Sequence, residues 1–169
     1  MLAAVDLVRD FLNTHDLDAD SDELSSPAEL AVWLRERGLI QRLDRAGDDD
    51  LACALALREG LRAALRGDPV DLPVLPLRVT PGDTPKLVPI EDGVPGGLAV
   101  ITAALTDVSW SRLKICAEIT CQWAFIDSSK NRSRSWCSMR VCGNRTKTRA
   151  YRARKQGSRH LQGSNTDTV

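Results

Sequence analysis

Apolar residues recur at helical spacing near the start of the chain. Leu2, Val5, Val8 and Leu12 follow one another at three and four residues and predict one helix that ends near Thr14. The next segment, 15–25, is polar and acidic, and its pattern predicts a loop.

Two further helices follow this loop. Ser26-Pro27-Ala28-Glu29 has the elements of a capping box with proline at the first helical position, and this helix should run to Gly38. A third helix is predicted from 48–50, three acids that suit a helix N-terminus, to Gly67 as the stop. Cys53 lies among alanines and leucines of this helix and is expected to be a small buried hydrophobe.

A proline-rich segment then interrupts the helical pattern. The prolines between Asp68 and Gly97 forbid a regular helix, but 75–80 and 86–90 are suited to two short strands joined by a turn at 81–83. An irregular loop is the alternative. Helical spacing resumes over 98–108.

The last third of the chain carries two pairs of cysteines, Cys116 with Cys121 and Cys137 with Cys142, and each pair encloses four residues. Two such pairs can bring four thiolates around one ion, and sulfur alone satisfies zinc in structural sites. We therefore predict a zinc site with these four ligands and no open position for catalysis. Two disulfides or unrelated core thiols are the alternatives, and iron could occupy the same thiolates. The N-terminus shows no export signal that would favour disulfides.

Aromatic residues surround these cysteines. Two short strands are predicted at 109–115 and 122–127, on either side of the first pair. The tryptophans and Phe125 are expected to form a miniature core around the metal, because a domain this small needs a staple. One of them could instead be a platform on which a base stacks. The residues concerned are Trp110, Trp123, Phe125 and Trp136.

The formal net charge of zero conceals an asymmetry. Residues 1–111 hold ten Lys and Arg against twenty Asp and Glu, whereas residues 112–160 hold thirteen against two. Such an asymmetry points to a polyanionic partner for the basic part. No apolar run is long enough to cross a bilayer, so we expect a cytoplasmic protein without a membrane partner.

The cations of the basic part gather in two places. One is the polar loop 127–135, whose hydroxyls and cations suit phosphate oxygens. The other is a helix predicted after Asn144, which would carry cations on neighbouring faces and could neutralise phosphates or read guanine edges. For both segments, the alternative is a solvated surface without a nucleic-acid partner. The predicted nucleic-acid-binding residues are Lys130, Arg132, Arg134, Arg145, Lys147, Arg149, Arg152 and Arg154.

The sequence Cys142-Gly143-Asn144-Arg145, together with the upstream cysteines, resembles the CGNR zinc-finger proteins, which are bacterial transcription regulators. The similarity extends through 116–127 and 135–139, and to Lys147, Tyr151, Arg152 and Arg154. In the N-terminal part, 11–14 and 33–34 look like the helical domain of stress-induced transcription regulators. The resemblance implies a helical domain joined to a four-cysteine zinc finger that binds DNA. One departure is Gln122, where a small residue is expected after the second cysteine.

These observations predict a mainly α fold with three parts. Residues 1–108 should form an acidic helical regulatory domain with a possible small β-hairpin, 109–156 a basic zinc finger with a β-hairpin and a helix, and 157–169 a disordered tail. The helical domain would sense a small-molecule effector, form a homodimer or restrain the basic helix in cis. Asn13 is the candidate ligand-binding residue there, although a polar residue that ends an apolar helix can also bind the backbone of a neighbour.

The predicted function is a transcription regulator and not an enzyme. A protein-interaction adaptor, in which the finger contacts an acidic protein surface, is the first alternative. A metal-dependent nuclease is the second, with Asp127 and Asn131 as its candidate residues. It is disfavoured because neither histidine, His15 nor His160, is expected near the zinc.

Overall fold

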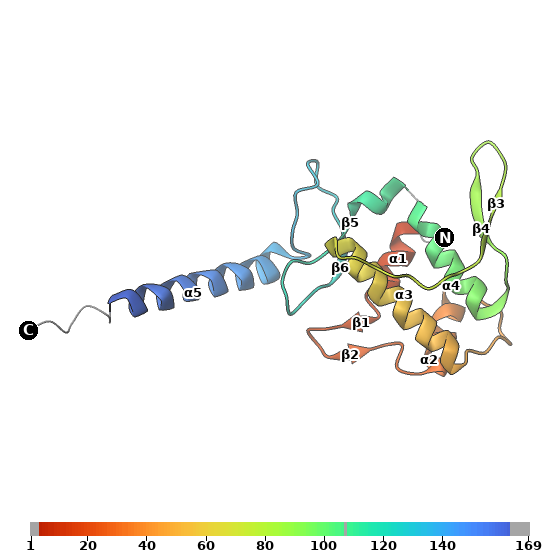
Figure 1. The fold of residues 1–169 in the computed structure, drawn as a ribbon, viewed down its shortest axis with the longest axis horizontal. Helices are drawn as coiled ribbons and strands as arrows, with labels where there is room; N and C mark the ends of the chain where they lie inside the picture. Colours follow the sequence, from red (N-terminus) through yellow and green to blue (C-terminus); the bar gives the residue numbers. More distant parts are fainter. Residues whose placement is uncertain (1–3, 107, 163–169) are drawn as a thin grey trace, which may run out of the picture.

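The computed structural model describes residues 4–106 and 108–162 of the 169-residue chain. They form a helical body, a small hairpin with cysteine loops at its edge, and one long helix that projects away from both (Figure 1). The mainly α fold with small hairpins is as predicted.

Three helices of the body are those that the apolar spacing predicts. They are α1 (Ala4–Leu12), α2 (Pro27–Glu36) and α3 (Asp48–Arg66). The Ser26 hydroxyl accepts a hydrogen bond from the Glu29 N–H at 3.3 Å, which caps α2 as the capping box requires. Gly67, with a φ of +82°, ends α3 in the left-handed conformation that glycine adopts without strain.

The fourth helix, α4 (Gly93–Ala103), corrects the prediction that prolines exclude a helix up to Gly97. Pro95 lies in the first turn, where a backbone N–H has no intrahelical partner, so the missing donor costs nothing. The predicted end at Val108 is also wrong, because α4 stops at Ala103 and two 3₁₀ turns follow, η1 (Ala104–Thr106) and η2 (Val108–Arg112).

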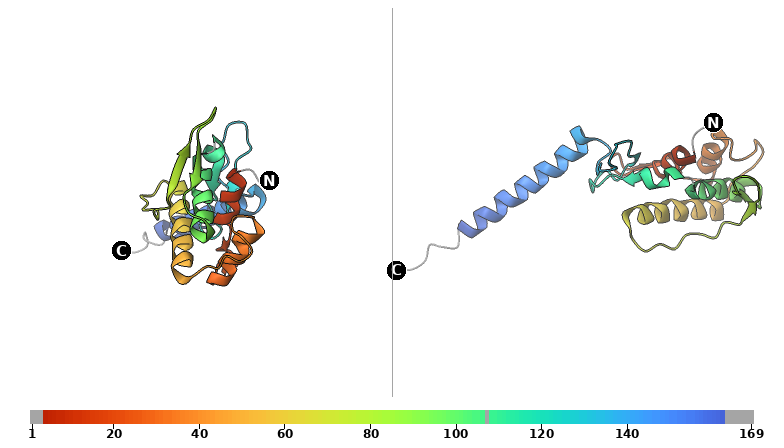
Figure 2. Two further views of the ribbon diagram at one scale, coloured as in Figure 1. Left: turned by 90° about the vertical axis from the view of Figure 1, so that its right-hand side faces the viewer. Right: turned by 90° about the horizontal axis from the view of Figure 1, so that it is seen from above.

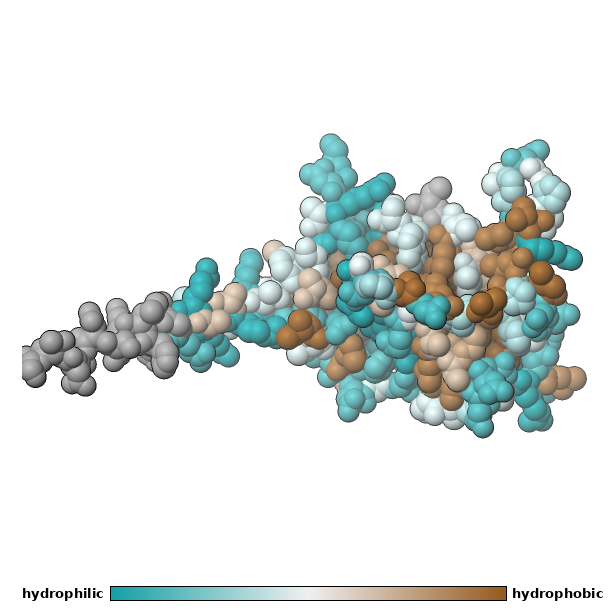
Figure 3. All heavy atoms as spheres, in the orientation of Figure 1, coloured by the Kyte–Doolittle hydropathy of each residue, from teal (hydrophilic) through white to brown (hydrophobic). Residues whose placement is uncertain are grey.

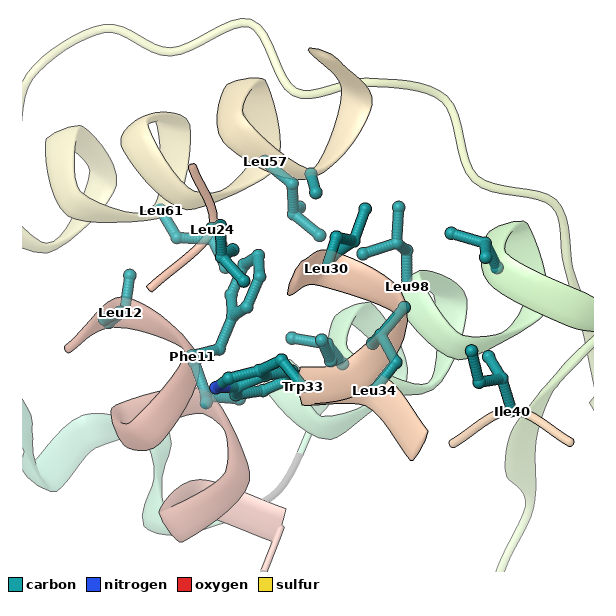
Figure 4. Close-up of a cluster of buried hydrophobic side chains, with 14 of the residues drawn as sticks. Phe11, Leu12, Leu24, Leu30, Trp33, Leu34, Ile40, Leu57, Leu61 and Leu98 are labelled. Carbon is teal, nitrogen blue, oxygen red and sulfur yellow. The ribbon is translucent and has the colours of Figure 1, made fainter. Parts of the chain in front are cut away.

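Side chains from all four helices share one apolar core (Figure 4). Phe11 and Trp33 lie at its centre with ring centroids 5.6 Å apart and ring planes tilted by 60°. Burying a leucine side chain contributes about 2 kcal/mol, so the core is held by many such contributions. The labelled residues are Phe11, Leu12, Leu24, Leu30, Trp33, Leu34, Ile40, Leu57, Leu61 and Leu98.

Three two-stranded antiparallel hairpins complete the fold. The first, β1 (His15–Asp16) with β2 (Ser21–Asp22), lies in the predicted acidic loop. The second, β3 (Leu77–Thr80) with β4 (Lys86–Pro89), confirms the possible hairpin over the irregular loop. The third, β5 (Leu113–Ile115) with β6 (Ala124–Ile126), is shorter than the predicted strands because 109–112 lies in η2.

The β5–β6 hairpin joins the body to the cysteine loops. Leu113 and Ala124 are buried in the core of the helical body, whereas Phe125, next along β6, packs against the cysteines. This alternation follows from the two faces of a strand. One face of the hairpin therefore packs against the helical body and the other against the cysteines.

The C-terminal helix, α5 (Asn144–Gln162), follows a π-helical turn, η3 (Met139–Gly143). The right-hand view of Figure 2 shows that α5 leaves the cysteine loops and projects away from the body. The helix continues through 157–162, where the sequence analysis places the start of a disordered tail. The rest of that predicted tail, 163–169, lies outside the described residues.

Candidate metal centre and nucleic-acid interface

The fold brings the four predicted cysteines of the finger together. Cys116 follows β5, Cys121 closes the first loop, and Cys137 and Cys142 enclose the second. Their Sγ atoms all lie within 4.8 Å of one another. The Sγ atoms of Cys121 and Cys137 are 3.7 Å apart, and those of Cys137 and Cys142 are 3.6 Å apart.

These distances fit a tetrahedral zinc site. With Zn–S bonds of about 2.3 Å, the edges of an S₄ tetrahedron are about 3.8 Å long. A disulfide would need about 2.05 Å, and all four cysteines are free thiols. The disulfide alternative is therefore wrong, and the donor set is the one that structural zinc prefers.

Without a cation, the electrostatics of the site act differently on two of these thiols. Burial raises the pKa of the Cys121 thiol to about 11, and the neighbouring Cys142 adds to the rise. Burial acts on Cys116 in the same direction, but hydrogen bonds from backbone N–H groups hold the pKa of Cys116 below its usual value. A bound dication would favour the thiolates of both.

Three of the four predicted aromatic residues surround this centre. Trp123, Phe125 and Trp136 pack against Cys116 and Cys142 and form the miniature core. Trp110, which lies in η2, instead packs against the core of the helical body.

The loop before the second cysteine pair is organised by a buried acid. The Asp127 carboxylate accepts hydrogen bonds from Lys114 Nζ at 2.7 Å, from the Ser129 hydroxyl at 2.6 Å and from the Arg134 N–H at 3.0 Å. The Lys114 ammonium group holds the pKa of Asp127 well below its usual range, although burial opposes this. Asp127 is fully buried and engaged, so it does not present the open carboxylate that the nuclease alternative requires.

The first cysteine loop contains a second buried acid, which the sequence analysis did not single out. Glu118 accepts hydrogen bonds from Arg149 Nη2 at 2.6 Å and from the Thr146 hydroxyl at 2.9 Å. The hydrogen bond from Arg149 lowers the pKa of Glu118 to about 2, against the effect of burial. The available signal was an acid between two cysteines in an otherwise basic segment.

The predicted cations of the loop are exposed. Arg132 Nη1 donates to the Ser111 hydroxyl at 3.1 Å. Arg134 Nη2 donates to the Cys137 carbonyl at 2.7 Å, and its guanidinium lies 5.2 Å from the centre of the Phe125 ring. Lys130 is exposed in the turn 129–132, which a hydrogen bond from the Arg132 N–H to the Ser129 carbonyl closes.

The predicted cations of α5 fall into two groups. Arg145 and Arg149 are paired with acids: both Nη atoms of Arg145 lie 2.9 Å from the Asp18 carboxylate in the β1–β2 turn, and Arg149 binds Glu118. The second group, Lys147, Arg152 and Arg154, is exposed like Arg149, and Lys147 and Arg152 make no ion pair with a described residue. Figure 3 shows the hydrophilic surface of the projecting helix beside a body on which hydrophobic residues gather.

A shallow groove of about 590 Å³ runs along one side of this helix. Arg145, Arg149 and Arg152 recur along it at four and three residues, so their side chains share that side of the helix. Lys147 and Arg154 lie on the other side by the same periodicity. The groove is lined by Val141, Asn144, Arg145, Thr148, Arg149, Arg152, Ala153 and Gln156.

Asn13 joins the two regions by a pair of hydrogen bonds. Its Nδ2 donates to the Ala124 carbonyl at 2.9 Å, and its Oδ1 accepts from the Ala124 N–H at 2.8 Å. Both polar atoms of the side chain thus bind the backbone of a neighbour. This geometry gives Asn13 a role at the junction between α1 and β6, and a ligand there would have to displace Ala124.

The turn after the second cysteine is fixed from the helical body. Gln122 adopts a left-handed conformation with a φ of +47°, at the position where a small residue is expected. Arg62 Nη1 donates to the Gln122 carbonyl at 2.9 Å, and Arg62 Nη2 donates to the carbonyls of Leu12 and His15. Buried Arg62 therefore ties α3 to the end of α1 and to the first cysteine loop.

Comparison with known families covers almost all of the described chain. Residues 6–111 match the family described as "Putative stress-induced transcription regulator", and residues 112–155 match the CGNR zinc finger. The chain belongs to this regulator family. Its four-cysteine cluster lies within the part that matches the CGNR zinc finger, which indicates zinc as the metal. No curated protein matches the chain.

The regulator family is named for transcription and not for an enzymatic activity. Within the described residues, no helix has both the length and the apolar character needed to cross a membrane.

Proposed function

We propose that this member of the regulator family binds double-stranded DNA through α5 and the loop 128–134. Zinc held by Cys116, Cys121, Cys137 and Cys142 would fix the two loops from which α5 begins. The zinc has a structural role in this proposal, because four thiolates leave no open coordination position.

One observation supports this proposal above the others: the finger shows only positive charge on its surface. Glu118 and Asp127 are the only acids in 112–156, and both are fully buried. Exposed cations with no exposed acid in the same segment favour a polyanion such as the phosphate backbone, and the body supplies an exposed acid, Asp18, to Arg145.

The shape of α5 suits the same partner. Its 19 residues correspond to about 28 Å of helix, and the major groove of DNA admits one α-helix. Beyond its first turns α5 extends past the body, so its exposed sides are open to a long partner (Figure 1).

The experiment is a fluorescence anisotropy titration of a labelled DNA duplex at several salt concentrations, with zinc content measured on the same samples. Replacing two phosphate-binding cations, as in Lys147→Ala with Arg152→Ala, should reduce the salt slope of log K by about 1.8. The control removes two exposed cations of the β3–β4 hairpin, Arg78→Ala with Lys86→Ala, and should leave the slope unchanged. Salt-independent binding, or no binding by the zinc-loaded protein, would refute the proposal.

A protein-interaction adaptor is favoured by a different observation. Three apolar side chains of the cysteine loops are exposed: Ile119 by 67%, Met139 by 54% and Val141 by 49%. Binding to an acidic protein without binding to DNA of matched charge would support this alternative. The small-molecule effector, the homodimer and the cytoplasmic location stay predictions from the sequence.

A further inference from the structure

The orientation of α5 depends on contacts at its first turns. A helix of about 28 Å that is held at one end moves its far end by about 5 Å when it tilts by 10°. Such a displacement exceeds the donor–acceptor distance of a hydrogen bond, about 3 Å. A helix that binds DNA through hydrogen bonds along its length therefore needs a fixed direction. The question is which side chains fix it.

Glu118 connects α5 to both cysteine loops. Its side chain has no exposed surface, and its two oxygens bind different residues of the helix, Oε1 the Arg149 guanidinium and Oε2 the Thr146 hydroxyl. The Thr120 hydroxyl, in the same loop as Glu118, also donates to Oε1 at 3.2 Å. The Trp136 indole N–H, beside the second loop, donates to the Thr146 hydroxyl at 3.2 Å.

Because Glu118 is buried, the direction of α5 must keep both of its contacts to the helix. A buried carboxylate that loses its partners is strongly unfavourable. Thr146 and Arg149 lie three residues apart and therefore on one side of the helix. Only a narrow range of helix directions brings both of them to the same carboxylate.

We propose that Glu118 is the positioning residue that transmits the fold of the zinc centre to α5, with Arg149 as its partner and not as a contact to DNA phosphate. The inference rests on the proposed function, because a fixed helix direction matters for a groove-binding helix. The inference assigns different roles to two cations on the same side of α5. Arg149 positions the helix, whereas Arg152 is exposed, makes no ion pair with a described residue and can bind phosphate.

The test compares Arg149→Ala, Glu118→Gln, the double variant and Arg152→Ala in the full-length zinc-loaded protein. A lost phosphate contact lowers the salt slope of log K by about 0.9, which is expected for Arg152→Ala. Arg149→Ala should lower the DNA affinity and leave the slope unchanged. The double variant should lose no more affinity than the weaker-binding of the two single variants, because both changes break the same ion pair between Arg149 and Glu118.

Two results would overturn this inference. One is a slope reduced by Arg149→Ala as much as by Arg152→Ala. The other is additive losses in the double variant. If Glu118→Gln fails to retain zinc, the slopes of Arg149→Ala and Arg152→Ala still decide between the two roles.

A second measurement separates this inference from the proposed function. Spin labels on α5 and on α3 report the distribution of distances between the helix and the body without DNA. Arg149→Ala should broaden this distribution, and Arg152→Ala should not. If the protein binds no DNA, the proposed function fails, while a broadened distribution supports the positioning role and an unchanged one refutes it.

Discussion

The helical body and the zinc finger bury charges of opposite sign. Among the described residues, the buried charged side chains of the body are Arg58 and Arg62, whereas those of the finger are Glu118 and Asp127. The body is acidic in sequence and the finger is basic. The finger therefore hides both of its acids and the body hides two of its ten cations, so the surface asymmetry is sharper than residue counts indicate.

The buried charges also join elements that are distant in the chain. Arg58 binds the Asp22 carboxylate with two hydrogen bonds of 2.7 Å and ties α3 to the β1–β2 hairpin. Arg62 binds three carbonyl groups in place of a carboxylate. In the finger, Lys114 and Arg149 have the corresponding role toward Asp127 and Glu118. Buried minority charges thus act as structural links on both sides.

The two regions differ most in the size of their apolar cores. Four helices of the body share a continuous core, whereas the buried apolar cluster of the finger consists of Cys116, Phe125 and Cys142 with four half-buried neighbours. A cluster this small does not hold a fold without a staple. We infer that metal binding carries the stability of the finger and burial that of the body.

Of the changes considered, loss of zinc should have the largest effect, and it should affect the finger far more than the body. In Cys142→Ser, the loops 116–121 and 137–142 should lose their order while α1–α4 keep their packing, because the body does not depend on the metal. Zinc analysis with hydrogen exchange of backbone amides measures both. Cys53→Ser, a change in α3 outside the cluster, is the control and should retain one zinc per chain. Uniform loss of protection across the body would contradict the contrast.

Removal of a buried cation should have the next largest effect. Arg62→Leu leaves the carbonyls of Leu12, His15 and Gln122 without their donor, and the free energy of unfolding should fall by about 3 kcal/mol. Urea denaturation measures this change. Arg66→Leu, one turn further along α3, removes a guanidinium whose ion pair with Asp68 is exposed, so its effect should stay below about 1 kcal/mol. Equal effects of the two changes would show that burial of Arg62 has no structural importance.

Removal of a buried anion should have a smaller effect that depends on pH. The pKa of Asp127 is lowered in the folded protein, so Asp127 contributes stability above the usual aspartate pKa of about 3.9 and loses that contribution as pH falls below it. Asp127→Asn should therefore be less stable than the native protein at pH 7, with a difference that narrows below about pH 4. Unfolding by urea at pH 7, 5 and 3 measures it. Asp83→Asn, an exposed acid in the β3–β4 turn, should show no such narrowing.

Local patterns predicted the parts of the molecule that depend on neighbouring residues. The cysteine spacing predicted the cluster, and Ser26 and Gly67 predicted helix ends, because caps and loops are local. The start of α4 was missed because a proline suits the first turn of a helix as well as a loop. In each case the evidence lies within a few residues of the feature.

The links between the two regions could not be predicted in this way. Arg145 and Asp18 are 127 positions apart, and Asn13 and Ala124 are 111 apart. No spacing rule connects such residues, so the sequence showed a row of equivalent cations on one helix. Only the fold shows which of them are already paired.

The pairing of Arg145 with Asp18 leads to the prediction with the smallest effect. This pair is exposed, with 39% and 45% of the two side chains accessible. A DNA phosphate and the Asp18 carboxylate would compete for the same guanidinium fork. Asp18→Asn should therefore raise DNA affinity by about 2- to 5-fold, which is the range expected for breaking an exposed ion pair.

Asp20→Asn is the matched control for this change. It removes the same charge from the same hairpin, and asparagine tolerates the left-handed φ of +51° at that position. A larger gain for Asp18→Asn, measured by anisotropy at constant salt, would show that the acidic body restrains the basic helix through one specific contact. Equal gains would mean that the acidic body acts on α5 only through its overall charge.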